Sequence, residues 1–141
     1  MGFRILNTFH HTVVRASGGR LGSRAYGLDM VELVTTGRRS GRSHSTMLLV
    51  PLRDGSDLVL VASKGGDQRD PDWFKNLVAN PLVRLTMRGN SVEMIARVVT
   101  PEEHALLWSR TVARYRHYEG YQRRAGRLIP LVICTPRDHE T

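Results

Sequence analysis

The sequence predicts an α+β domain in which about six short, mainly antiparallel strands close into a small barrel with flanking helices. Two turn signals, Arg53-Asp-Gly-Ser56 and Gly89-Asn90, each lie between two runs of strand length and predict β-hairpins. Because antiparallel hairpins dominate, a doubly wound α/β fold is disfavoured. Closing the strands into a barrel would also remove exposed sheet edges.

The chain has 141 residues, of which 40% are hydrophobic and 24% are charged, as expected for one folded domain. We expect an N-terminal helix and a connector over residues 1–28, the barrel over 29–136 and a short tail over 137–141. The single cysteine, Cys134, lies in an apolar, strand-like run. We therefore expect a buried thiol and no internal disulfide.

Residues 3–16 predict an amphipathic helix. Its apolar face carries Phe3, Leu6, Phe9 and Val13, and its polar face carries Arg4, Asn7, His11 and Arg15. Two placements stay open: packing on the domain itself, or lying on a membrane surface with help from the basic flank. No signal peptide is expected, and no apolar run approaches the roughly 20 residues that span a bilayer. We expect a cytoplasmic protein, with peripheral contact at the inner face of the cell membrane as the second placement.

The strands follow a connector, residues 17–27, that contains four glycines. Runs of apolar and β-branched residues predict six strands, over residues 30–36, 46–52, 57–62, 82–88, 91–99 and 129–134.

Helices are expected in two places between these strands. The run from Asp70 to Ala79 predicts a short helix capped by Asp70. Thr100-Pro-Glu-Glu103 is a capping box, which predicts a helix from there to about Tyr115. A second helical stretch continues to about Arg127.

Basic residues outnumber acidic ones by 21 to 13, which gives a net charge of +8, and all but two of them are arginine. The planar guanidinium group can bind a phosphate or carboxylate through two parallel hydrogen bonds. A basic surface suits nucleic acid, an anionic membrane face or a polyanionic small molecule. We do not expect nucleic acid, because the charges are dispersed and no basic motif is interleaved with aromatic residues.

Two glycine-containing turns that follow strands have the composition of anion sites. Thr35-Thr-Gly-Arg-Arg-Ser-Gly41 offers backbone N–H groups, two guanidinium groups and a serine hydroxyl. Ala62-Ser-Lys-Gly-Gly66 adds a serine and a lysine to glycines that permit positive φ. The alternatives are a solvated basic turn and a loop that needs glycine only for its geometry.

Aromatic residues form two further candidate features. Trp73 and Asn76 are neighbours on the short helix, where they could hold a planar ring, although Trp73 could equally be a core residue. Tyr115, Tyr118 and Tyr121 recur at a spacing of three, which places three phenols on one broad helical face. They could line a substrate pocket or form an interfacial face with hydroxyls in water.

Several kinds of catalytic site are not expected. The six histidines show no i, i+4 pair and there is no cysteine pair, so we expect no metal site. No nucleophile elbow, dinucleotide fingerprint or matched pair of catalytic carboxylates is present. Hydride transfer does not need such groups, because the cofactor carries the reaction.

From about Met30 to Pro136, the chain resembles the deazaflavin-dependent nitroreductase family of actinobacteria, which includes the F420H2-dependent quinone reductases. The strings that carry the resemblance, in matching order and separation, are Thr35–Gly41, Arg53–Gly55, Val61–Gly66, Pro71–Leu77, Ala79–Pro81 and Tyr118–Arg123. The resemblance implies a split β-barrel of the flavin-mononucleotide-binding type and coenzyme F420 in its reduced form as the hydride donor. F420 is a deazaflavin with a phosphodiester and an oligoglutamate tail, and its negative charge would explain the basic turns.

The resemblance also implies roles for individual residues. Those that would hold the phosphate and tail of the coenzyme are Arg38, Arg39, Ser40 and Gly41. Those that would lie against or flank its deazaflavin end are Ala62, Ser63, Lys64, Gly65, Trp73 and Asn76. Those that would act on the acceptor are Ser63, Tyr115, Tyr118 and Tyr121.

The implied reaction is hydride transfer from C5 of the deazaflavin to a quinone, a nitroaromatic compound or an activated enone. We expect the Ser63 hydroxyl and one tyrosine, Tyr118 first, to hydrogen-bond the acceptor oxygen as charge develops. Met47 stands where relatives commonly have proline, and the run before the Arg53 turn is one residue longer than usual, so acceptor choice is less defined than cofactor choice. A membrane-dissolved menaquinone would suit a membrane-bound N-terminal helix.

Two other functions on the same barrel stay open. One is a reductase that uses flavin mononucleotide (FMN), and the other is a carrier that binds F420 or a lipid without turnover. The resemblance favours a monomer.

Overall fold

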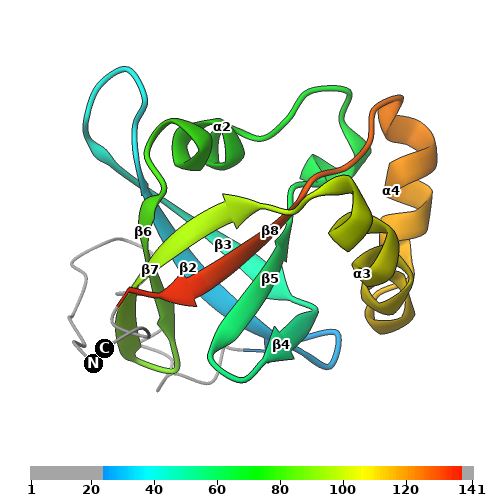
Figure 1. The fold of residues 1–141 in the computed structure, drawn as a ribbon, viewed down its shortest axis with the longest axis horizontal. Coiled ribbons are helices and arrows are strands. Elements are labelled where there is room, and N and C mark those ends of the chain that lie inside the picture. Colours follow the sequence, from blue (N-terminus) through cyan, green and yellow to red (C-terminus); the bar gives the residue numbers. More distant parts are fainter. Residues whose placement is uncertain (1–23, 138–141) are drawn as a thin grey trace.

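The computed structural model describes residues 24–137 as a curled antiparallel sheet, with one helix over its top and two helices at one side (Figure 1). In chain order the elements are β1 (Arg24–Ala25), β2 (Leu28–Thr36), β3 (Ser43–Val50), β4 (Leu52–Asp54), β5 (Asp57–Val61), the short turn η1 (Lys64–Gly66), α2 (Asp72–Ala79), β6 (Leu82–Met87), β7 (Asn90–Val98), α3 (Pro101–Arg114), α4 (His117–Ala125) and β8 (Leu131–Pro136). The N-terminal helix expected at residues 3–16 lies outside the described residues.

The consecutive strands β3 and β4 lie at opposite edges of the sheet. The strands pair in the order β4, β5, β8, β7, β6, β2, β3, and β1 also pairs with β2. Pro51 is fully buried between β3 and β4, and it has no N–H group to continue the ladder. The chain therefore leaves β2 at Pro51 and pairs next with β5, which curls the sheet into the predicted split barrel.

The number of strands differs from the expected six, because eight are present in the described residues. The strand expected over residues 46–52 begins at Ser43 and is interrupted by Pro51. The first residues of this strand are polar, so the sequence did not indicate them as a strand. In the structure Ser43 pairs with Thr36 in a long hairpin.

Strand β1 lies within the expected connector. It forms a tight hairpin with β2 around Tyr26 and Gly27, which both have positive φ, 55° and 74°. This geometry is typical of two-residue hairpin turns, but Asn or Asp usually occupies the first position. Tyr26 therefore gave no turn signal.

One of the two expected helix caps is present in the structure and the other is not. The capping box is confirmed: Glu103 N donates to Thr100 Oγ1 at 3.2 Å, and Thr100 N donates to Glu103 Oε1 at 2.8 Å. The cap expected from Asp70 is wrong, since α2 begins after Pro71 without a side-chain cap. The Asp70 carboxylate instead accepts a hydrogen bond from Arg127 Nη1 at 2.8 Å.

Two hydrophobic clusters support the fold. The barrel interior is filled by side chains from α2 and from the strands β2, β3, β5, β6, β7 and β8. A second cluster joins α3 and α4 to the end of the barrel. Cys134 lies in the first cluster and is 0% exposed, as expected. Burial raises the pKa of its thiol from 9.0 to about 12.

This buried thiol predicts a loss of stability in alkali. An unfolded Cys134 ionises as the pH rises above about 9, while the folded thiol stays protonated up to about 12, so its contribution to stability is lost across that range. We expect the free energy of unfolding in urea to fall between about pH 9 and 11, and to fall less steeply in Cys134→Ala than in the wild type. Equal slopes for the two proteins would contradict this assignment.

Candidate active site

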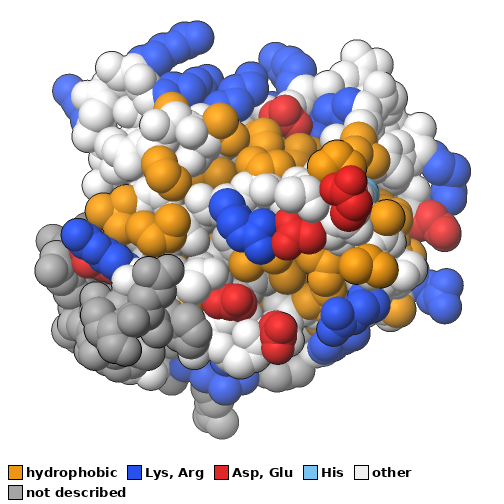
Figure 2. Space-filling model, in the orientation of Figure 1, with side chains coloured by type: hydrophobic (Ala, Val, Ile, Leu, Met, Phe, Trp, Pro, Cys, Tyr) orange, Lys and Arg blue, Asp and Glu red, His pale blue; other side chains and the backbone are white. Residues whose placement is uncertain are grey.

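A surface groove of about 610 Å³ lies between the β2–β3 hairpin and α2. Five of the expected cofactor-binding residues line it, namely Arg38, Arg39, Ser40, Trp73 and Asn76. Thr35, Gly37 and His44 also line it and were not singled out as individual residues. Basic side chains project along the upper edge of the molecule, where the hairpin and α2 lie (Figure 2).

Asn76 joins the hairpin to α2. Its side chain is 4% exposed, and Oδ1 accepts hydrogen bonds from the Arg38 backbone N–H at 3.1 Å and from Arg38 Nη1 at 2.8 Å. Asn76 Nδ2 donates to Thr35 Oγ1 at 3.2 Å. Arg38 also pairs with Asp72 at 3.4 Å. The amide of Asn76 therefore fixes the wall of the groove and the direction of the Arg38 side chain.

The tip of the hairpin is a tight turn. Gly41 has a φ of +73° and donates its N–H to Gly37 O at 3.0 Å. A Cβ atom at Gly37 would lie 2.7 Å from Ser40 Oγ, so the turn has little room for a side chain there. Arg39 is exposed and has no acidic partner within the described part of the chain. Its guanidinium group is available for an anion in the groove.

The second expected anion turn, after β5, lies outside this groove. Lys64, Gly65 and Gly66 have φ values of 47°, 63° and 90°, which confirms that the turn uses positive φ. Ser63 is largely buried before it. The turn lies against α4, because a Cβ atom at Gly66 would be only 3.0 Å from the Tyr121 Cα atom.

The three tyrosines form one aromatic cluster. Tyr115 is the C-cap of α3, whereas Tyr118 and Tyr121 lie in α4, so the expectation of one continuous helical face is wrong. The ring centroids are 4.8 Å apart for Tyr115 and Tyr118, and 6.1 Å apart for Tyr118 and Tyr121. Tyr118 is only 4% exposed and packs into the second hydrophobic cluster. The expected grouping of the three rings is therefore present.

Burial also affects the acidity of these phenols. It raises the pKa of Tyr118 well above its usual range, and the charges of neighbouring tyrosinates would add to the shift. Burial, followed by hydrogen bonding with Tyr121, raises the pKa of Tyr115 to about 12. Both hydroxyls are protonated at neutral pH and can donate hydrogen bonds.

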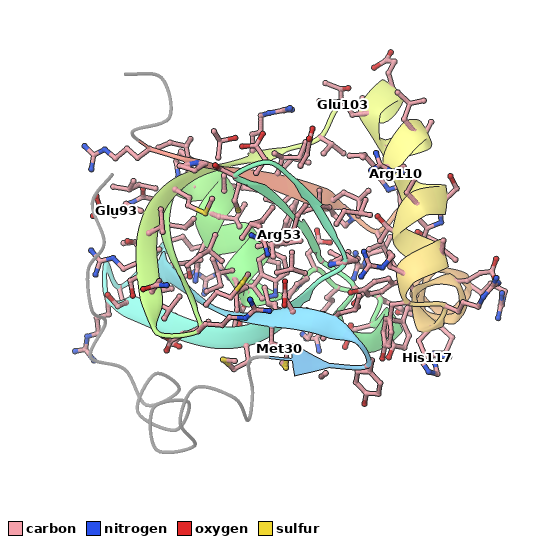
Figure 3. All side chains as sticks on the ribbon, turned by 90° about the horizontal axis from the view of Figure 1, so that it is seen from below. Met30, Arg53, Glu93, Glu103, Arg110 and His117 are labelled. Carbon is pink, nitrogen blue, oxygen red and sulfur yellow. The ribbon has the colours of Figure 1, made fainter. Side chains whose placement is uncertain are left out.

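Two rings that the sequence did not indicate complete the cluster. Tyr26, from the β1–β2 turn, is 73% exposed and lies 5.3 Å from Tyr115 between centroids. His117 lies 5.0 Å from Tyr115, at the end of the molecule formed by α3 and α4 (Figure 3). Tyr26 is about ninety positions away in the chain from the other tyrosines, so no local pattern could have grouped them.

Within residues 24–137, no three His, Cys, Asp or Glu side chains come together as a metal site. None of the helices in this part of the chain is long and apolar enough to cross a membrane.

A family model and relatives of 30% identity or more indicate the family of the chain. A family model described as F420H(2)-dependent quinone reductase matches residues 6–136. An F420H(2)-dependent quinone reductase of Mycobacterium tuberculosis is 36% identical over 141 residues, which cover 97% of this chain and 93% of that protein. A solved structure of an F420-H2 dependent reductase has a TM-score of 0.67 and 35% identity, over 74% of this chain and 92% of its own. Another, described as a domain-swapped dimer, has a TM-score of 0.67 and 31% identity, over 87% of this chain and 97% of its own. The resemblance seen in the sequence is confirmed, and the chain belongs to the F420H(2)-dependent quinone reductase family.

Proposed function

We propose that the chain is an F420H2-dependent oxidoreductase that reduces a quinone, and that the groove between the β2–β3 hairpin and α2 holds the anionic part of the coenzyme. The observation that carries this proposal is the pair Arg38 and Arg39 on the wall of a groove of about 610 Å³, in a chain of this family. Family membership makes F420 the cofactor, so the FMN alternative is not needed.

The residues of the groove fit a polyanion. Arg39 is free to bind a phosphate or carboxylate, and Arg38 is held in the groove wall by Asn76 and Asp72. The Ser40 hydroxyl adds a donor at the same turn. An open groove, rather than a closed cavity, also suits a tail of several glutamates.

The turn after β5 and the tyrosine cluster would serve the other end of the coenzyme. When bound, reduced F420 supplies the hydride from C5 of its deazaflavin ring. We place Ala62, Ser63, Lys64 and Gly65 against that ring, with Trp73 between the ring and the groove. Tyr115, Tyr118 and Tyr121 then orient the acceptor and donate hydrogen bonds to its oxygen. The support is their proximity, since Gly66 touches the backbone of Tyr121.

Removal of one phenol tests this placement. Tyr118→Phe keeps the ring that fills the second cluster and removes only the donor. We expect kcat to fall about tenfold to a hundredfold, because a donor in a site that excludes water stabilises developing charge strongly, while the Kd for F420 changes less than about twofold. The measurement is steady-state turnover of F420H2 with menadione, alongside a coenzyme titration.

Tyr26→Phe is the matched control, because its exposed ring lies at the rim of the same cluster. It should retain near wild-type turnover. A Tyr118→Phe protein with unchanged kcat would remove Tyr118 from the catalytic role.

Coenzyme binding can be tested without an acceptor. Titration of the protein with oxidised F420, followed by coenzyme fluorescence, should show saturable binding that weakens as salt is added. FMN should compete poorly, because it lacks the glutamate tail that the arginines would bind. Tighter binding of FMN than of F420 would contradict the proposed use of the groove.

The range of acceptors and the oligomeric state are predictions. We propose that nitroaromatic compounds and activated enones are further acceptors. We also propose that menaquinone at the inner face of the membrane is reached through residues 3–16, which lie outside the described residues. The monomer expected from the sequence contrasts with the similar structure described as a domain-swapped dimer. Light scattering of the purified protein decides between these two states.

A further inference from the structure

One arginine outside the groove holds the whole loop between β5 and α2. The Arg127 side chain is 15% exposed and lies between α4 and β8. Its Nη2 donates to the carbonyl oxygens of Ala62 and Ser63, both at 3.2 Å, and its Nε donates to Asp67 O at 3.0 Å. Its Nη1 pairs with the Asp70 carboxylate at 2.8 Å. A single guanidinium group thus contacts the loop before the η1 turn, after it and two residues before α2.

The loop needs such support because its backbone is unusual. Three consecutive residues, Lys64 to Gly66, have positive φ, and Lys64 has a side chain that disfavours this region. Two backbone hydrogen bonds close the turn, Gly66 N to Ser63 O at 2.9 Å and Asp67 N to Lys64 O at 3.1 Å. Conformations of this kind persist where surrounding contacts determine them.

Arg127 is itself held in place from α4. Gln122 Nε2 donates to Arg127 O at 2.5 Å, and Gln122 Oε1 accepts the N–H of Ile129 at 2.9 Å. Arg124 Nη2 adds a hydrogen bond to Gly65 O at 3.3 Å. The helix that carries Tyr118 and Tyr121 is therefore joined to the Ser63 turn through a fixed set of contacts.

We propose that Arg127 is a positioning residue that sets the Ser63–Gly65 turn and the start of α2 at the geometry needed for F420. This inference rests on the proposed function, because it assigns the turn to the coenzyme. The hydrogen bonds of the Arg127 guanidinium group go to the protein itself. Arg127 acts by holding carbonyl groups on both sides of the turn, which requires the forked donors of arginine and which the single ammonium of lysine cannot reproduce.

Arg127→Lys tests the proposal. We expect faster hydrogen exchange at the amides of Gly66 and Asp67 with unchanged exchange in β2 and β3. We also expect the KM for F420H2 to rise and kcat to fall, with kcat/KM lower by roughly tenfold to a hundredfold, while the KM for menadione is little changed. Asp70→Asn, which removes only the charged partner, should give a smaller change in the same direction.

Arg97→Lys is the matched control, because Arg97 also makes two hydrogen bonds, both 2.8 Å, to Glu103 on a different part of the fold. It should leave both the exchange of the turn and the KM for F420H2 unchanged. An Arg127→Lys protein with wild-type exchange at the turn or wild-type kcat/KM for F420H2 would overturn the inference.

Different results would overturn the proposed function and the role of Arg127. If the wild-type protein does not bind F420, the proposed function is overturned, and the role assigned to Arg127 in catalysis falls with it. If the wild type binds F420 and Arg127→Lys has the same kcat/KM for F420H2 as the wild type, the role assigned to Arg127 is wrong and the proposed function stands. The exchange measurement uses no coenzyme, so it decides whether Arg127 holds the turn in either case.

Discussion

Arg39→Glu is expected to weaken F420 binding about a hundredfold without changing the fold. Arg39 is exposed on the groove wall and has no acidic partner among residues 24–137, so its replacement breaks no ion pair described there. The change removes an attraction to the anionic tail and adds a repulsion. At the effective dielectric near a protein surface, such a reversal costs about 3 kcal/mol, which corresponds to about a hundredfold in Kd. Fluorescence titration of the variant with F420 at low ionic strength measures the effect.

Arg42→Glu is the matched control for this charge reversal. Arg42 is exposed on the same hairpin but does not line the groove. It should weaken binding by a few-fold at most, through the change in overall field, and the difference between the two variants should shrink as salt is added. Equal losses for the two variants would show that the groove is not the anion site.

Gly66→Ala is expected to have the largest effect on stability, with a loss of about 3 kcal/mol in the free energy of unfolding. Gly66 has a φ of +90°, which strains any other residue. The new Cβ atom would lie 3.0 Å from Tyr121 Cα and 3.1 Å from Tyr121 O, and these backbone atoms cannot move without shifting α4. Turnover should fall as well, because the same shift separates the tyrosines from the Ser63 turn.

Gly65→Ala separates the two causes of this effect. Gly65 has a φ of +63°, but a Cβ atom there would meet nothing within 4 Å. It should cost about 1 kcal/mol, from backbone strain alone. Urea unfolding of the two variants gives the comparison. If both lose the same amount, the close approach of Gly66 to α4 is not a constraint.

The sequence predicted the parts of the fold that local chemistry determines. The capping box at Thr100 is present where expected, and the hairpin expected at Gly89-Asn90 is present with its turn one residue earlier, at Arg88 and Gly89. Both features depend on hydrogen bonds within a few residues of the signal. The strand that contains Cys134 is also present, because a run of apolar residues is stable only where it is buried in the core. The sequence string around Arg38 and Arg39 pointed to the region of the groove, because the two arginines are adjacent in one turn and both line it.

What the sequence did not indicate depends on contacts between distant segments. Asp70 had the composition of a helix cap, but Arg127, more than fifty positions later, binds its carboxylate. Tyr26 joins the tyrosine cluster only because a turn with positive φ brings it there. Pro51 divides one expected strand between two sheet edges, which is a property of barrel closure rather than of the run itself. Such features follow from tertiary packing, and propensity or spacing does not encode them.

Hydride transfer from F420H2 to a quinone can be followed in a single assay. The purified protein is mixed with F420H2 and menadione, and the return of the absorbance and fluorescence of oxidised F420 is followed over time. We expect oxidation that depends on both protein and menadione and that saturates with F420H2. Arg39→Glu should slow this oxidation at low coenzyme concentration. Tight binding of F420 without oxidation by menadione or any nitroaromatic or enone acceptor would show that the protein is not a reductase of these acceptors and would indicate a coenzyme carrier instead.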